Sequence, residues 1–192
     1  MNIDFITLTF FPENLTEILN KFKSVYEQKF VIKTINKNSV DNFYIQAYSS
    51  EDVKFILYSP KSNPNTTIMY ANIADGYIRR VKKLSELYDQ EYYNVVICTK
   101  NEERLDGYNF RYYSSTNCRV VLCYQDYQWI FYEEGTPLPF ENVELYKSRL
   151  KKKRLNKEVI LQYLKYLGWD LTDKNIWLTD KEIYEFIGIK GY

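Results

Sequence analysis

Hydrophobic and polar residues alternate over several short stretches in the first third of the chain, and one stretch between them has helical spacing. Residues 2–10, 30–35, 43–48 and 53–58 have the β-branched and aromatic content of strands. Between the first two, the apolar residues of 15–26 recur on one helical face. This pattern predicts a strand, a helix and three further strands.

The next part of the chain repeats this order of elements and adds one more strand at its end. Residues 66–71 have the composition of a strand, and the apolar positions of 78–88 lie on one face of a helix. Further strands are predicted at 93–99, 109–113, 119–124 and 129–132. The repeated order predicts an internal duplication with halves at 1–60 and 66–134, although few side chains match between the halves.

The spacing of apolar residues becomes helical after the Gly- and Pro-containing segment 135–139. It predicts one helix over 142–154 and a second between Asn156, as N-cap, and Gly168, as C-cap. Thr179 and Glu182 have the spacing of a capping box for a short last helix.

The order of these elements predicts an α+β protein with a mostly antiparallel sheet, or sheets, built from two β-α-β-β-β halves. The helices of the halves pack on one face of the sheet, and the C-terminal third is helical. The predicted regions are a sheet region over 1–135 and a helical region over 136–192 that packs on it.

One face of the predicted sheet carries tyrosines. Alternation places Tyr44 and Tyr48 on one face of their strand, and Lys54 and Tyr58 on one face of the next. An exposed sheet face that is amphipathic rather than purely apolar suits protein recognition, so these four residues are the predicted protein-binding site. The alternative is that the C-terminal helices cover this face.

Composition changes this picture by excluding several chemistries. The chain contains 20 Tyr, three Cys and no His. Without His, the Ser-His-Asp and Cys-His relays and the usual zinc sites cannot form. The glycines form neither of the familiar phosphate-binding loops. Cys118 and Cys123 are five positions apart, on opposite faces of a continuous strand, and are poor joint metal ligands. The sequence therefore predicts no catalytic residues, cofactor or metal, although an enzyme that uses only carboxylates, Lys and Tyr stays open.

A basic run in the C-terminal third is the strongest local charge feature, in a chain whose net charge is only +1. No acidic residue interrupts it, and its members are Lys147, Arg149, Lys151, Lys152, Lys153, Arg154 and Lys157. Three interpretations stay open. They are a solvated helix face neutralised by acidic residues of the same chain, a site for an acidic protein, and phosphate contacts with RNA or DNA.

Asp41, Asp52 and Lys54 have the loose spacing of a metal-dependent nuclease, in which two carboxylates hold Mg²⁺ and the Lys faces a phosphate. So short a pattern also arises by chance in a charged chain, and both Asp residues suit turns.

The sequence as a whole favours a non-catalytic protein-binding module, such as a bacterial or phage inhibitor or a toxin-neutralising immunity-type protein; this is an analogy of size and composition. Nucleic-acid binding through the basic run and a metal-dependent nuclease or phosphodiesterase are the alternatives. The first residues lack the pattern of a signal peptide, no apolar stretch spans a bilayer, and the cysteine count is odd. We therefore expect a cytoplasmic protein without membrane contact, and the oligomeric state stays open.

Overall fold

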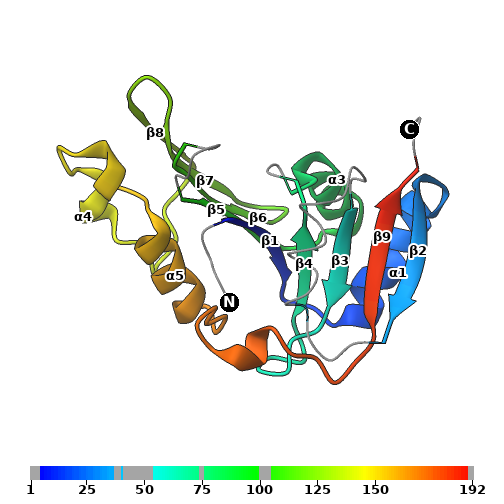
Figure 1. Ribbon diagram of the computed structural model, residues 1–192. Coiled ribbons are helices and arrows are strands. Elements are labelled where there is room, and N and C mark those ends of the chain that lie inside the picture. The colour runs from blue at the N-terminus through cyan, green and yellow to red at the C-terminus, as the bar shows by residue number, and fades with distance from the viewer. Residues whose placement is uncertain (1–4, 37–39, 41–53, 74–75, 100–104, 190–192) are drawn as a thin grey trace.

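The described residues form one nine-stranded sheet with helices on both faces (Figure 1). The computed structural model describes residues 5–36, 40, 54–73, 76–99 and 105–189. The strands are β1 (Phe5–Phe11), β2 (Phe30–Ile35), β3 (Lys54–Tyr58), β4 (Thr67–Ala71), β5 (Tyr92–Cys98), β6 (Gly107–Tyr113), β7 (Cys118–Gln125), β8 (Trp129–Glu134) and β9 (Ile183–Gly188). Their order is β2-β9-β3-β4-β1-β5-β6-β7-β8, and every neighbouring pair is antiparallel. The predicted α+β class with a mostly antiparallel sheet is confirmed.

Helices from different parts of the chain cover the two faces of the sheet. Helices α1 (Leu15–Tyr26) and α3 (Ile78–Tyr88) pack on one face. The other face carries α4 (Val143–Tyr146), α5 (Lys157–Tyr166) and the 3₁₀ turns η2 (Lys151–Lys153) and η3 (Lys174–Ile176). A further 3₁₀ turn, η1 (Glu27–Lys29), follows α1 directly. We call the faces the α1 face and the α5 face.

Aromatic side chains dominate both cores. On the α1 face, the ring of Phe55 stacks on that of Phe186, with centroids 4.6 Å apart, and Phe22 lies 5.4 Å from Phe55. On the α5 face, Phe10 stacks on Trp169 at 4.6 Å, and the indole N–H of Trp169 donates to Oγ1 of Thr66. Aromatic pairs in these geometries stabilise a core beyond the area that they bury.

The end of α5 has the predicted glycine cap. Gly168 has a φ of +84°, and its N–H donates to the carbonyl of Lys165. The N–H of Trp169 reaches back to the carbonyl of Leu164, which completes a Schellman motif. The cap turns the chain so that Trp169 enters the core of the α5 face.

The predicted last helix is wrong, because residues 183–188 form β9. Thr179 accepts a hydrogen bond from the N–H of Lys181, two residues on, instead of capping a helix three residues on. The residues that follow are rich in Ile, Tyr and Phe, which favour strands, and β9 finds partners on both sides in β2 and β3. A region predicted as wholly helical thus returns a strand to the sheet.

The structure does not confirm the predicted duplication. In the second half, β5, β6 and β7 are consecutive neighbours in the sheet. In the first half, β9 lies between β2 and β3, so the two halves differ in how their strands are connected. Among the described residues, no helix is long and apolar enough to cross a membrane.

Candidate protein-binding site

The α1 face is buried at the centre of the sheet and exposed at one end. Over β1 and β5, Thr7 and Asn94 are fully buried, because the segment that leads into α3 packs against them. Asn94 uses its amide to donate to Oγ1 of Thr9 and to the carbonyl of Leu8. Further along the sheet, residues of β7 and β8 on the same face belong to neither described core.

Five apolar and aromatic side chains share this exposed end of the sheet. Register pairs Leu122 with Tyr132 and Tyr124 with Ile130, and Val120 follows on the same side of β7. Tyr124 and Tyr132 are 40% and 47% exposed, and the other three are partly exposed. We call Val120, Leu122, Tyr124, Ile130 and Tyr132 the open face. No described helix packs over it (Figure 1).

The opposite face of the same strands is closed by a buried ion pair. Arg119 of β7 is 1% exposed, and its guanidinium binds Glu141, which precedes α4. Nε lies 3.0 Å from both carboxylate oxygens, and Nη2 lies 2.8 Å from Oε2. Nη2 also donates to Glu133 at 2.7 Å, and Nη1 donates to the carbonyls of Glu134 and Gly135. Each nitrogen of the guanidinium therefore has an acceptor.

Two tyrosines complete this cluster. The hydroxyl of Tyr146 donates to Oε2 of Glu141 at 2.7 Å and lies 2.9 Å from the hydroxyl of Tyr163 in α5. Burial, followed by the bonds to Tyr163 and Glu141, raises the pKa of Tyr146 well above its ordinary value, so its hydroxyl stays protonated. The cluster joins β7 and β8 to α4 and α5, and its closed hydrogen bonding indicates a structural role rather than catalysis.

The prediction that most of the basic run lies on one continuous helix is wrong. α4 ends at Tyr146, the chain turns, and η2 follows as a separate 3₁₀ turn. Arg154 closes this turn by donating to the carbonyl of Ser148 and lies 5.1 Å from the centre of the Phe131 ring in β8. The turn packs on the α5 face of β7 and β8, where Cys123 contacts the carbonyl of Lys151. The tertiary contacts of Tyr146 and Arg154 override the helical spacing.

Among the described residues, acidic side chains pair with only some members of the basic run. Of the acidic residues that were candidates for neutralising it, Glu144 binds Lys147, and Glu141 binds Arg119. Asp170, Asp180 and Glu185 pair with Lys165, Lys61 and Lys54. Within the described part of the chain, the exposed residues Arg149, Lys151, Lys152 and Lys153 form no ion pair with an acidic side chain. We call these four residues the basic turn; Lys157 lies at the start of α5, outside it.

The tyrosine face predicted from the first third of the chain is only partly described. Tyr44 and Tyr48 lie outside the described residues. Tyr58 is fully buried in the core of the α5 face, which contradicts its predicted exposure and matches the alternative that the C-terminal segment covers it. Lys54 forms an ion pair of 3.2 Å with Glu185 of β9 and is largely buried. An exposed, tyrosine-bearing sheet face is present, but on β7 and β8.

The structure does not describe the two carboxylates that the nuclease interpretation assigned as metal ligands. Asp41 and Asp52 lie outside the described residues, and Lys54 is paired with Glu185. Among the described residues, no group of three or more Cys, Asp and Glu residues is placed to hold a metal ion. Cys118 is exposed and Cys123 buried, on opposite faces of β7, as their spacing predicted.

The alternating pattern of residues 118–134 predicts which side chains of β7 and β8 share the open face. The sequence alone does not show which sheet faces stay uncovered. The pairing of Arg119 with Glu141 had no signal in the spacing of the chain, since 22 positions separate the two residues. Glu133 had no such signal either: its side chain is 41% exposed, yet its carboxylate contacts the buried guanidinium of Arg119.

Comparison with known proteins adds no assignment. No protein-family model matches the chain, and neither a curated protein nor a solved structure matches it.

Proposed function

We propose that the protein is a non-catalytic protein-binding module that recognises its partner with the open face. The observation that carries this proposal is the unequal cover of the α1 face, which is buried over β1 and β5 and exposed over β7 and β8. An inhibitor or a toxin-neutralising immunity protein would act in this way, by occupying a protein surface without chemistry.

The chemistry of the open face resembles that of recognition surfaces. Tyrosine and branched apolar side chains supply rigid contact area, and the tyrosine hydroxyls keep a polar tip. The hydroxyl of Tyr132 donates to Glu134 at 2.5 Å, and Tyr132 lies directly across from Leu122 in the paired strand. Rigid aromatic anchors lose little conformational entropy on binding and are common among the residues that dominate binding energy.

The experiment is affinity capture from the lysate of the native host with matched variants. Tyr124→Ser with Tyr132→Ser removes both exposed rings of the open face. The control is Tyr88→Ser with Tyr166→Ser, which removes two exposed rings, from α3 and α5, that are 40% and 71% exposed. Each variant is first checked for an unchanged circular dichroism spectrum and thermal midpoint.

The proposal expects one stoichiometric protein that the wild type and the control variant retain and the open-face variant loses. Capture is repeated at raised salt and after nuclease treatment, because an apolar interface survives both conditions. Equal retention by both variants would refute the open face as the binding surface. A set of proteins lost on nuclease treatment would favour nucleic-acid binding through the basic turn.

A further inference from the structure

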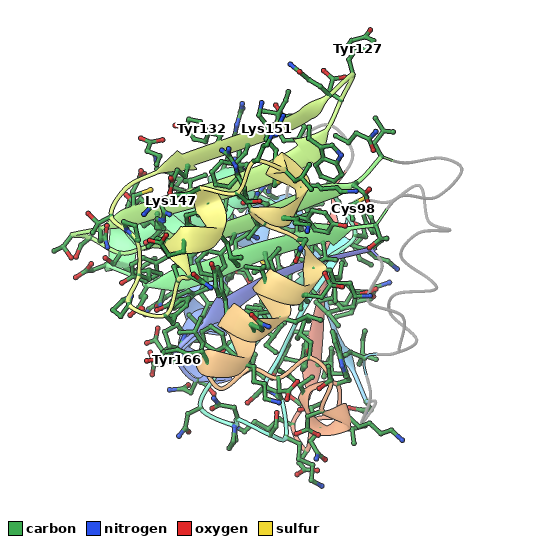
Figure 2. The ribbon with its side chains drawn as sticks, turned by 90° about the vertical axis from the view of Figure 1, so that its left-hand side faces the viewer. Cys98, Tyr127, Tyr132, Lys147, Lys151 and Tyr166 are labelled. Atoms are coloured by element: carbon green, nitrogen blue, oxygen red, sulfur yellow. The ribbon has the colours of Figure 1, made fainter. Side chains whose placement is uncertain are left out.

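Among the described strands, β8 forms one edge of the sheet, and no described strand pairs with its outer side. Its described backbone partner is β7, from Trp129 paired with Gln125 to Glu134 paired with Val120. Figure 2 shows β8, which carries Tyr132, along the upper border of the sheet, with Lys151 close to it. A strand at a sheet edge presents a row of backbone N–H and C=O groups to any extended segment beside it.

The first four residues of β8 lack the features that usually block pairing with another chain, and the charged residues Glu133 and Glu134 follow only at its end. The run Trp129, Ile130, Phe131 and Tyr132 favours strands strongly and contains no Pro, Gly or Lys. The opposite edge of the sheet, β2, carries Lys33 in its middle. An apolar edge segment without Pro, Gly or charge favours aggregation unless a partner pairs with it.

The basic turn lies beside the same edge on the α5 face. Arg154 packs over Phe131, and Lys151 contacts Cys123, the residue of β7 that pairs with Phe131. The backbone of η2 is therefore held next to the middle of β8, and the side chains of Lys151, Lys152 and Lys153 are exposed and without described acidic partners. An anionic group that approached Phe131 from the α5 face would lie near these lysines, and Glu133, the acidic residue of β8 on this face, is already bound to Arg119.

We propose that β8 pairs with an extended acidic segment of a partner protein, which adds to the sheet as a tenth strand. This inference rests on the proposed function and names the class of partner. Backbone hydrogen bonds to β8 supply affinity, and the basic turn supplies the preference for acidic residues.

The two faces of the added strand would differ in chemistry. Side chains that point to the α5 face lie beside the basic turn, and acidic residues fit there. Side chains that point to the α1 face extend the row formed by Leu122 and Tyr132, and apolar residues fit there. Because side chains alternate along a strand, the segment should alternate acidic and apolar residues over about the six positions of β8.

The test measures fluorescence anisotropy with labelled peptides of the length of β8. The first peptide alternates Glu and Val, and the second alternates Lys and Val. Two further peptides have the Glu and Val sequence with N-methyl groups on alternate backbone nitrogens. One carries them on the odd-numbered residues and the other on the even-numbered residues. The methyl groups remove backbone donors and leave the side chains unchanged. The protein is used as the wild type, as Lys152→Glu with Lys153→Glu, and as a matched control, Arg79→Glu with Lys83→Glu in α3.

The proposal expects saturable binding of the Glu and Val peptide and none of the Lys and Val peptide. The change at Lys152 and Lys153 should weaken binding by about tenfold or more, while the α3 control leaves it unchanged. N-methylation in one register should abolish binding, because that register places the methyl groups against β8. Equal binding of the acidic and basic peptides, or of both methylated peptides, would overturn the proposal.

Two further measurements distinguish a failure of strand addition from a failure of the proposed function. A labelled single-stranded oligonucleotide that binds more tightly than the acidic peptide, and is lost in the Lys152 and Lys153 variant, would overturn the acidic-protein assignment in favour of nucleic acid. If the acidic peptide fails while capture of a protein still depends on Tyr124 and Tyr132, strand addition is refuted and the proposed function stands.

Discussion

Arg119 and Glu141 form a buried ion pair in which two nitrogens of the guanidinium contact the carboxylate at 2.8–3.0 Å. Both side chains are almost completely inaccessible to solvent. One belongs to β7 and the other to the segment before α4, so the pair fixes the C-terminal segment against the sheet. This contact helps to hold the basic turn beside β8, which links the stability of the fold to both proposed surfaces.

Replacing Glu141 by Gln should destabilise the protein strongly. The substitution keeps the shape of the side chain but leaves the Arg119 charge buried without its main partner. Breaking a buried pair in this way typically costs about 3–5 kcal/mol. Urea unfolding followed by circular dichroism measures the change.

Glu144→Gln is the matched control for this experiment. Glu144 pairs with Lys147 at 2.7 Å, but both side chains are more than 70% exposed. An exposed pair contributes at most about 1 kcal/mol, so this variant should unfold close to the wild type. Similar losses of stability in the two variants would show that the buried pair has no special role.

Gly135→Ala should destabilise the end of β8 more than Gly168→Ala destabilises the end of α5. Both glycines have left-handed φ values, +83° and +84°. A Cβ at Gly135 would lie 1.9 Å from the carbonyl oxygen of Cys118, whereas at Gly168 it meets no atom within 4 Å. Gly168→Ala should cost about 1–2 kcal/mol for its backbone conformation alone, and Gly135→Ala about 3 kcal/mol or more. Thermal unfolding of the two variants measures the difference, and equal losses would contradict the described turn after β8.

The protein should lose stability in alkaline solution through its buried tyrosines. Burial, followed by the charge of Asp106, raises the pKa of Tyr108 to about 12, and burial raises the pKa of Tyr92, Tyr146 and Tyr163 as well. Above the ordinary value of 10.0, the unfolded chain releases these protons while the folded protein keeps them. The stabilisation is therefore complete below pH 10 and falls as the pH rises through the folded pKa values, by up to about 1.4 kcal/mol per pH unit for each tyrosine.

Urea unfolding at several pH values tests this expectation, together with the ultraviolet absorbance of tyrosinate. Loss of the folded circular dichroism signal should accompany ionisation of the buried tyrosines. Ionisation of all 20 tyrosines in a protein that stays folded would contradict the described burial.

Local patterns predicted the elements that have strong local signals. The helix over 15–26, the strands at 30–35 and 66–71, and the cap at Gly168 agree with the structure within a few residues. In these segments, hydrophobic spacing and capping chemistry point to the same structure as the tertiary contacts.

Long-range contacts decided the elements that the sequence did not predict. Residues 183–188 become a strand because two sheet neighbours are available, and the predicted helix over 142–154 is interrupted where Tyr146 and Arg154 meet Glu141 and Phe131. Tyr58 was expected on an exposed face, but it is covered because the C-terminal segment folds back over β3. The candidate site depends on which faces stay uncovered, and alternation alone does not contain that information.

Hydrogen–deuterium exchange of the protein with and without its captured partner tests the central claim most directly. Backbone amides in β8 and the neighbouring strand β7 should gain protection in the complex, because the partner covers the open face and pairs with the free edge. Amides of α1 and α3 should exchange at the same rate in both states. Protection confined to α1, α3 or β2, with β7 and β8 unchanged, would contradict the account.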